Sequence, residues 1–282
     1  MEPFQRAQRA LNRIIRKRPW MLLAIPTFNG GAMFLIYPYL ADPLQDALGT
    51  AGARDVAEGV GSFLTVVGVI YALIIGFTFQ QAFARQAELR QKLTTEASSL
   101  RNLLLLSGTM YVATAQETVA NHLRSYVGQL LDQEFPPRDT ADAAPTLYRI
   151  VPVLNEISAD GTADAVDRIT LNAIHDELRT TTRARSERLS IAARHIPRIH
   201  WFQIELLSTL IMVGFLLLDL HAPLLEALLL GLTSSAIMVL YLSLFDLDYP
   251  FGGLWRVEPL GLQRLRHELC GKPGKPGEAR RA

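Results

Sequence analysis

Cysteine is almost missing from this sequence of 282 residues, which contains Cys270 and no other. A single thiol cannot close an internal disulfide or supply a cysteine-rich metal site, so both classes of protein are excluded. The six histidines are scattered, with no pair at the spacing that a zinc site on one helix uses. The formal net charge of +1 gives no overall attraction to nucleic acid. We therefore expect no metal, no cofactor and no nucleic-acid partner.

Catalytic motifs are missing as well. The sequence has no serine nucleophile elbow and no nucleotide fingerprint, and Gly59 and Gly61 are not followed by the Gly-Lys-Ser/Thr of a phosphate-binding loop. Basic residues in the middle of the chain alternate with acidic ones, as at Arg185, Glu187 and Arg188, which is typical of a solvated helix face. These absences indicate that the protein is not an enzyme.

Long apolar runs are what the sequence has instead. Hydrophobic residues make up 49% of the chain and charged residues only 20%, a composition that favours a membrane protein. A membrane helix needs about 20 apolar residues. Four runs qualify, at 19–40, 60–79, 201–220 and 223–245. The first contains Pro26 and the Asn-Gly-Gly sequence at 29–31, which predicts a kinked helix. The last two are so close that they predict an antiparallel hairpin.

The charges outside the runs predict the orientation. Six basic residues lie in the first 18 positions, which predicts a cytoplasmic N-terminus, and the sequence after the second run and the tail are also basic. Carboxylates inside or beside the runs, at Glu205, Asp219 and Glu226, lie near predicted span ends, where they can reach the interface. A signal peptide is the alternative for the first run, but no small-residue cleavage site follows it. We expect a multi-pass inner-membrane protein with both termini in the cytoplasm.

The predicted organisation is all-helical, because the segment between the second and third runs has helical periodicity throughout. Apolar residues at helical spacing predict three sets of buried positions. The sets are Leu89, Leu93, Ala97, Leu100 and Leu104, then Val119, Leu123, Tyr126 and Leu130, and then Leu147, Ile150, Val151 and Leu154. The predicted parts are a basic N-terminus at 1–18, two transmembrane helices within 19–80, a cytoplasmic helical segment at 81–198, two transmembrane helices within 199–246 and a cytoplasmic tail at 247–282.

The second run has two contrasting faces. Small residues recur at helical spacing along one of them, and this face would let another helix approach closely. They are Gly61, Thr65, Gly68, Ala72 and Gly76. Bulky apolar residues lie on the opposite face, which must meet lipid, a third helix or the axis of an oligomer. They are Phe63, Val66, Ile70, Ile74 and Phe77. A ring of such side chains would form a hydrophobic constriction that gates ions by dewetting.

Several short motifs resemble those of the bestrophin-like proteins, bacterial relatives of the bestrophin channels. Segment 68–77 reads Gly-Val-Ile-Tyr-Ala-Leu-Ile-Ile-Gly-Phe, and 96–100 reads Glu-Ala-Ser-Ser-Leu. Further on, Arg185, Arg188 and Leu189 precede Pro197 and Trp201, and Asp-Tyr-Pro-Phe-Gly follows the last run at 248–252. The order and spacing of the apolar runs also match that family.

The resemblance implies a four-span, all-helical subunit that assembles as a pentamer around an axial pore. Bestrophins take bulky apolar residues of the pore neck from the second span, which by analogy gives Val66, Ile70, Ile74 and Phe77. Animal bestrophins place a calcium-binding acidic run after the Pro-Phe-Gly motif. This chain continues with Gly-Leu-Trp-Arg at 253–256.

The sequence after the last run therefore predicts a turn in place of a calcium site. Asp246 and Asp248 are too few for the six to eight oxygens that calcium prefers. We expect Asp248 to tether the turn, Pro250 to end the helix, and Phe251 and Gly252 to complete the change of direction.

Two functions compete at this point. The first is an oligomeric channel for inorganic ions, with anions as the first candidates. The second is a non-conducting membrane scaffold or signalling adaptor whose cytoplasmic helices bind a protein partner. A membrane-embedded enzyme has no nucleophile, base and metal constellation in its favour.

Overall fold

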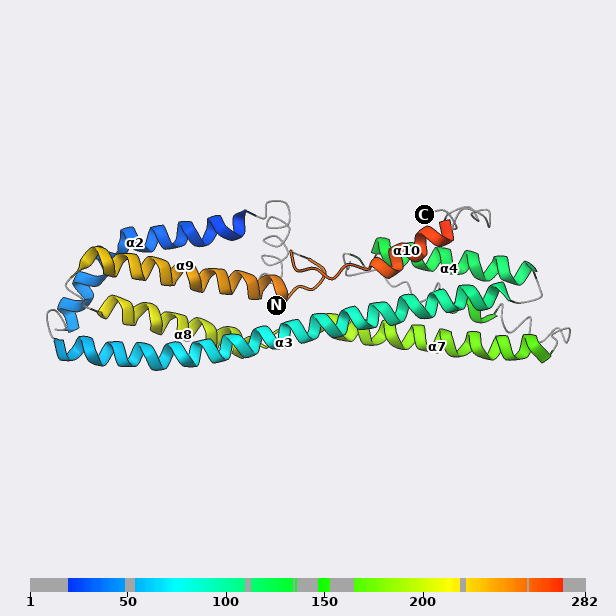
Figure 1. Cartoon of the computed structure of the whole chain (residues 1–282), viewed down its shortest axis with the longest axis horizontal. Coiled ribbons are helices and arrows are strands. Elements are labelled where there is room, and N and C mark those ends of the chain that lie inside the picture. The colour runs from blue at the N-terminus through cyan, green and yellow to red at the C-terminus, as the bar shows by residue number, and fades with distance from the viewer. Residues whose placement is uncertain are drawn as a thin grey trace, which may run out of the picture. The chain divides into compact units, whose positions relative to one another are not determined.

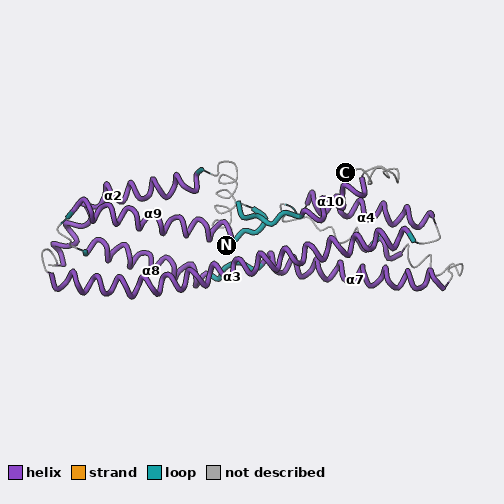
Figure 2. The backbone as a smooth tube through the Cα atoms, viewed as in Figure 1, coloured by secondary structure: helices purple, strands orange, loops and turns teal. Residues whose placement is uncertain are grey.

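The computed structural model describes residues 20–48, 54–109, 113–133, 135, 147–152, 165–218, 222–252 and 254–270. All the regular elements in these ranges are helices, which confirms the all-α prediction (Figure 2). The described chain divides into two compact units. Unit 1 comprises Met1–Arg85 and His195–Arg256, and unit 2 comprises Gln86–Arg194 and Val257–Ala282. The basic N-terminus at 1–18, Asp219 and the tail after Cys270 lie outside the described residues.

Four helices are described in unit 1. They are α2 (Met21–Leu48), the first part of α3 (Arg54–Gly108), α8 (Arg198–Leu217) and α9 (Pro223–Leu247). The start of α9 suits its sequence, because Pro223 in the first turn has no N–H that would need a partner. The core of unit 1 brings together apolar residues of α3, α8 and α9. They include Val67, Tyr71, Ile75, Ile204, Ile211 and Leu244.

Three stretches of the described chain are long and apolar enough to cross a membrane, at Glu58–Gly108, Arg168–Leu217 and Pro223–Leu247. They contain the second and fourth predicted runs and residues 201–217 of the third. The first predicted run lies in α2, which is not among the three. Pro26, Pro38 and Pro43 lie inside this helix. The four-span arrangement therefore stays a prediction.

α2 packs along α9 through small and polar residues. A Cβ atom added to Gly30 would lie 1.9 Å from Ser235 Oγ and 2.5 Å from the backbone oxygen of Gly231, so the two helices approach as closely as glycine allows. Asn29 Nδ2 donates a hydrogen bond to Ser234 Oγ at 2.6 Å, and Ser235 Oγ donates to the Pro26 carbonyl at 2.9 Å. Figure 1 shows α2 bending along its length, as its internal prolines favour.

Unit 2 is built from the second part of α3, α4 (Ala113–Gln133), α7 (Ala165–Ala193) and α10 (Leu260–Cys270), with α10 packed on α4. Most of the positions that helical periodicity predicted to be buried here are buried. They are Leu89, Leu93, Ala97, Leu100, Val119, Leu123, Tyr126, Leu130, Leu147 and Ile150. Leu104 and Val151 are only partly buried, and Leu154 lies outside the described residues. Cys270 closes α10 and is exposed. α3 itself runs unbroken for 55 residues, so no helix boundary lies at residue 80.

Candidate functional site

The surface of α3 in unit 1 carries the residues that the sequence singled out. Val67, Tyr71 and Ile75 are at most 6% exposed and point into the core. Their spacing of four residues marks the inward face of the helix. Residues about half a turn away must face outward, and the sequence places bulky apolar side chains there.

The outward face is apolar and open within this chain. Exposed fractions are 59% for Val66, 56% for Val69, 43% for Ile70, 55% for Leu73 and 64% for Phe77. A single soluble chain rarely leaves such a patch in water, so lipid or another protein chain must cover it.

The predicted neck residues do not all share this face equally. Val66, Ile70 and Phe77 are exposed, but Ile74 is partly buried and packs against the core cluster of unit 1. Val69 and Leu73, which the sequence analysis did not select, are as exposed as Val66. The geometry therefore centres the outward strip on Val66, Val69, Leu73 and Phe77.

The small-residue face of α3 is also open. A Cβ atom added to Gly61, Gly68 or Gly76 would meet no atom within 4 Å in the described chain, and Ala72 is exposed. No helix of the described chain packs there. Close packing occurs instead where Gly30 meets Gly231, and where a Cβ at Gly214 would lie 2.4 Å from Leu64 Cδ2. The small residues of the second predicted span remain available to a second chain.

The turn after α9 is fastened by two buried carboxylates. The Asp248 carboxylate accepts a hydrogen bond from the Ile196 backbone N–H at 2.8 Å and pairs with Arg85, whose Nη1 lies 3.3 Å away. Arg85 Nη2 also donates to the Leu247 carbonyl at 2.9 Å. Asp248 therefore ties the end of α9 to α3 and to the segment before α8.

His195 completes this arrangement, with Nδ1 3.4 Å from Asp248 Oδ2. The hydrogen bond to Asp248 raises the pKa of His195 more than burial lowers it. For Asp248, burial is the largest single influence and would raise the pKa. Hydrogen bonds from His195 and the Ile196 N–H, together with the Arg85 charge, outweigh it and lower that pKa. Both groups lie outside the predicted spans, and in both the shift favours the charged form.

Asp246 organises the return of the chain. Its carboxylate accepts hydrogen bonds from the backbone N–H groups of Leu254 and Trp255, each at 3.0 Å. α9 ends at Leu247, three residues before Pro250. Gly252 is needed at its position, because a Cβ there would lie 2.4 Å from the Tyr249 ring.

These contacts do not suit a divalent cation. The oxygens of Asp246 and Asp248 already face hydrogen-bond donors and the positive Arg85, whereas calcium needs several oxygens free to turn toward it. In the part of the chain that the structure describes, no group of three or more potential metal ligands gathers. Phe251 is partly buried in the same turn.

Unit 2 holds a buried ion pair formed by two residues from the sequence motifs. Arg188 Nε donates to Glu96 Oε2 at 2.8 Å, and neither side chain is more than 1% exposed. The Tyr126 hydroxyl donates to the other carboxylate oxygen at 3.1 Å, and the Arg188 guanidinium lies 5.1 Å from the centre of the Phe135 ring. This pairing could not be predicted from local sequence patterns, because 92 residues separate the partners.

Comparison with known proteins agrees with this architecture. Residues 35–262 match the family model of the bestrophin-like domain. A mutant of a bacterial bestrophin homologue from Klebsiella pneumoniae is 13% identical, with a TM-score of 0.67 over 89% of this chain and 98% of that one. A structure of the Klebsiella homologue solved by Zn-SAD phasing is 14% identical, with a TM-score of 0.65 over 89% and 97%. No curated protein matches the sequence.

Proposed function

This chain belongs to the bestrophin-like family, and on that premise we propose that several copies of it form a membrane channel for inorganic ions, with anions as the first candidates. The observation that carries the proposal is the outward apolar strip of α3, at Val66, Val69, Leu73 and Phe77. A strip of this kind is unsuited to water in a single chain. In a closed ring of copies it can face the axis.

A ring of these side chains would act as a hydrophobic neck. Bulky apolar groups around a narrow axis exclude water when they close and pass hydrated ions when they separate. Of the four neck candidates that the family resemblance implies, Val66, Ile70 and Phe77 are exposed enough to take part. Ile74 packs against the core and would contribute least. We add Val69 and Leu73 to the proposed neck.

The small-residue face fits the same assembly. In a ring, each copy touches one neighbour with one surface and the other neighbour with a different surface. Gly61, Gly68, Ala72 and Gly76 have no packing partner within the described chain and would let a neighbouring copy approach closely. A pentamer, as the family resemblance implies, is the expected assembly.

The proposed topology has four spans in the bacterial inner membrane and both termini in the cytoplasm. α2 serves as the first span. Its packing on α9 supports this assignment, as does the Tyr37 hydroxyl, which donates a hydrogen bond to the buried Glu226 carboxylate and so satisfies two polar groups within the bilayer. Basic residues after the second span, including Arg85 and Arg90, support the orientation.

The test is ion flux through purified protein in liposomes, with chloride and potassium measured separately. Leu73→Ala and Phe77→Ala should each change the rate or the selectivity. Leu232→Ala is the matched control, since Leu232 is 59% exposed on α9 and Leu73 is 55% exposed on α3. The control should behave as wild type.

Two results would count against the proposal in different ways. If wild-type protein carries no flux under varied voltage, pH and calcium, the channel is wrong and the scaffold or adaptor becomes the better explanation. If flux occurs but neither α3 variant alters it, the channel stands and the proposed neck is wrong.

A further inference from the structure

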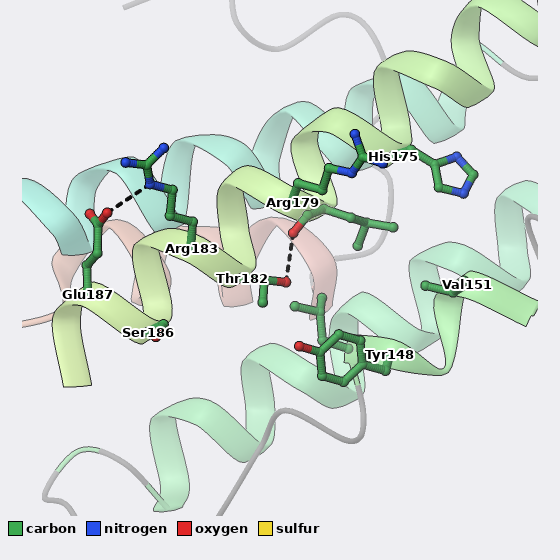
Figure 3. Close-up of a pocket in the computed structure, with 10 residues that line it drawn as sticks. Tyr148, Val151, His175, Arg179, Thr182, Arg183, Ser186 and Glu187 are labelled. Carbon is green, nitrogen blue, oxygen red and sulfur yellow. Dashed lines mark hydrogen bonds and ion pairs between the residues drawn. The ribbon is translucent and has the colours of Figure 1, made fainter. Parts of the chain in front are cut away.

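Unit 2 contains a cavity of about 630 Å³ that the channel proposal does not use. It lies between α7 and the short helical segment 147–152, and Figure 3 shows Tyr148 and Val151 on that segment facing a run of α7 residues. Cavities that hold small organic ligands usually measure about 300 to 1,000 Å³. This one is therefore the right size for a small molecule and too small for a folded partner.

The inner wall of the cavity is apolar. Leu147 and Leu178 are 2% and 7% exposed, so their side chains are held firmly by the core of unit 2. Val151 and the Tyr148 ring extend this surface from the facing segment. Burying an apolar ligand group here would release water chiefly from Val151 and the Tyr148 ring, which are the more exposed of the four.

One edge of the cavity carries two arginines. Arg179 and Arg183 lie four residues apart, on the same face of α7 as His175. The Arg179 and Arg183 side chains are 84% and 82% exposed, so both can turn toward a ligand. Thr182 and Ser186 also line the cavity, and the Thr182 hydroxyl donates a hydrogen bond to the Leu178 carbonyl at 2.8 Å.

The two arginines differ in the ion pairs that they already form. Arg183 Nε donates to Glu187 Oε1 at 2.9 Å, and Glu187 also pairs with Lys92. Hydrogen bonds from Lys92 and then Arg183 lower the pKa of Glu187 and keep it charged. Arg179 has a looser partner, because its Nη1 lies 3.6 Å from Asp176 Oδ1 and both side chains are largely exposed. An exposed pair of this kind contributes little and is easily exchanged for a ligand.

We propose that this cavity binds a small amphipathic anion, with its apolar body against Leu147, Val151 and Leu178 and its carboxylate or phosphate group on Arg179. The guanidinium fork suits both oxyanions, because it can donate two parallel hydrogen bonds to either. A neutral ligand could contact the same apolar wall, but it could not form an ion pair with the arginines at the edge. Charge and shape therefore favour the anion, and the proposal does not depend on ion conduction.

The test uses the full chain in lipid nanodiscs and octanoate as the probe. Binding is followed by saturation-transfer NMR, with empty nanodiscs subtracted. Saturable octanoate binding is expected, with weaker binding of octan-1-ol, which has the same chain and no charge. Octyl phosphate in the same assay distinguishes a phosphate site from a carboxylate site.

Three variants locate the site. Arg179→Gln should weaken binding by about tenfold or more, the usual cost of losing a charge-assisted hydrogen bond. Val151→Trp should abolish binding by filling the cavity. Arg90→Gln, an exposed arginine on α3 outside the cavity lining, should bind as wild type. Equal melting temperatures would establish that the variants are folded.

The proposal is overturned if wild-type protein shows no saturable octanoate binding. That result would arise, for example, if a neighbouring copy covers the cavity. It is also overturned if Arg179→Gln and Arg90→Gln bind equally well. Octanol binding as strong as octanoate would contradict the role of Arg179.

Discussion

The Asp248 carboxylate accepts a hydrogen bond from the Ile196 backbone N–H at 2.8 Å, across 52 residues of chain. This contact fixes the residue that follows α9 against the segment that leads into α8. Arg85 of α3 joins the same carboxylate. Three helices of unit 1 are thus held together where their apolar parts end. The cluster formed by Asp248, Arg85 and His195 is therefore the first target for substitution.

Removing the Asp248 carboxylate should destabilise unit 1 strongly. Asp248→Ala removes the carboxylate that pairs with Arg85, whose side chain is 11% exposed, and breaking a buried ion pair costs about 3 to 5 kcal/mol. Asp248→Asn should cost less because the amide oxygen can still accept the Ile196 N–H. The melting temperature of the purified protein in detergent is the measurement.

Asp132→Ala is the control, since its pair with Arg266 is exposed and should contribute no more than about 1 kcal/mol. Equal decreases in melting temperature for Asp248→Ala and Asp132→Ala would show that the cluster does not stabilise unit 1.

The same cluster should make stability depend on pH. The pKa of His195 is raised in the folded state, so its contribution is complete below the unfolded value of about 6.5 and is lost as pH rises through the folded value. The pKa of Asp248 is lowered, so its contribution is present above the unfolded value of about 3.9 and is lost on acidification. Stability should therefore be greatest between these limits.

Melting temperatures across pH 5 to 8 test this dependence. Wild-type protein should melt at a lower temperature at pH 8 than at pH 5.5. The change should be modest, because the His195 side chain is 39% exposed and solvent screens its charge. His195→Gln should reduce the slope. An identical slope in the variant would assign the pH dependence to other groups.

The stability of unit 2 should depend on whether one or both partners of its buried ion pair are replaced. Arg188→Met removes the guanidinium that pairs with the buried Glu96 carboxylate, at a cost of about 3 to 5 kcal/mol. The double variant Glu96→Gln with Arg188→Met should recover part of this loss, because neither charge of the pair remains. Thermal loss of the helical circular dichroism signal measures both.

Arg101→Ala breaks an exposed pair with Glu268 and should be nearly neutral. A double variant no more stable than Arg188→Met would contradict the explanation by an uncompensated charge.

Neighbouring glycines in α2 provide a matched pair for the contact with α9. Gly30→Ala would bring a methyl group into Ser235 and Gly231 and should cost about 1 to 3 kcal/mol. Gly31→Ala meets nothing within 4 Å in the described chain and should be neutral or stabilise by up to about 1 kcal/mol. Resistance to denaturation in mixed detergent micelles is the measurement. Similar effects of the two substitutions would mean that α2 and α9 do not pack closely in the membrane.

Sequence periodicity predicted much of the fold, because burial in a helix repeats every three to four residues. Leu89, Leu93 and Leu100 were selected on that basis and are buried. Composition found the apolar runs for the same reason, since lipid and core both demand apolar side chains. Periodicity and apolar composition are local properties of the sequence, so they can be read without knowing which segment packs against each helix.

Pairings between distant segments could not be predicted in this way. Asn29, Gly30 and Gly31 read as a kink, yet Gly30 is where α2 meets Gly231 of α9. The glycine in α9 followed by Ser234 and Ser235 was the available signal, because small and hydroxyl residues often mark helix contacts in membranes. The outward faces of α3 could not be assigned from the sequence for the same reason. The neighbouring copy that would determine whether Ile74 or Leu73 faces the proposed pore is a separate chain.

The exposed Cys270 at the end of α10 is the chain's one thiol, and this gives each copy a single natural attachment point for a fluorophore. Maleimide dye should therefore attach once per polypeptide without any engineered substitution. The number of photobleaching steps in a single particle then counts the subunits directly. A membrane-impermeant version of the dye, offered to inverted or right-side-out vesicles, would report which side of the bilayer the C-terminal helix occupies.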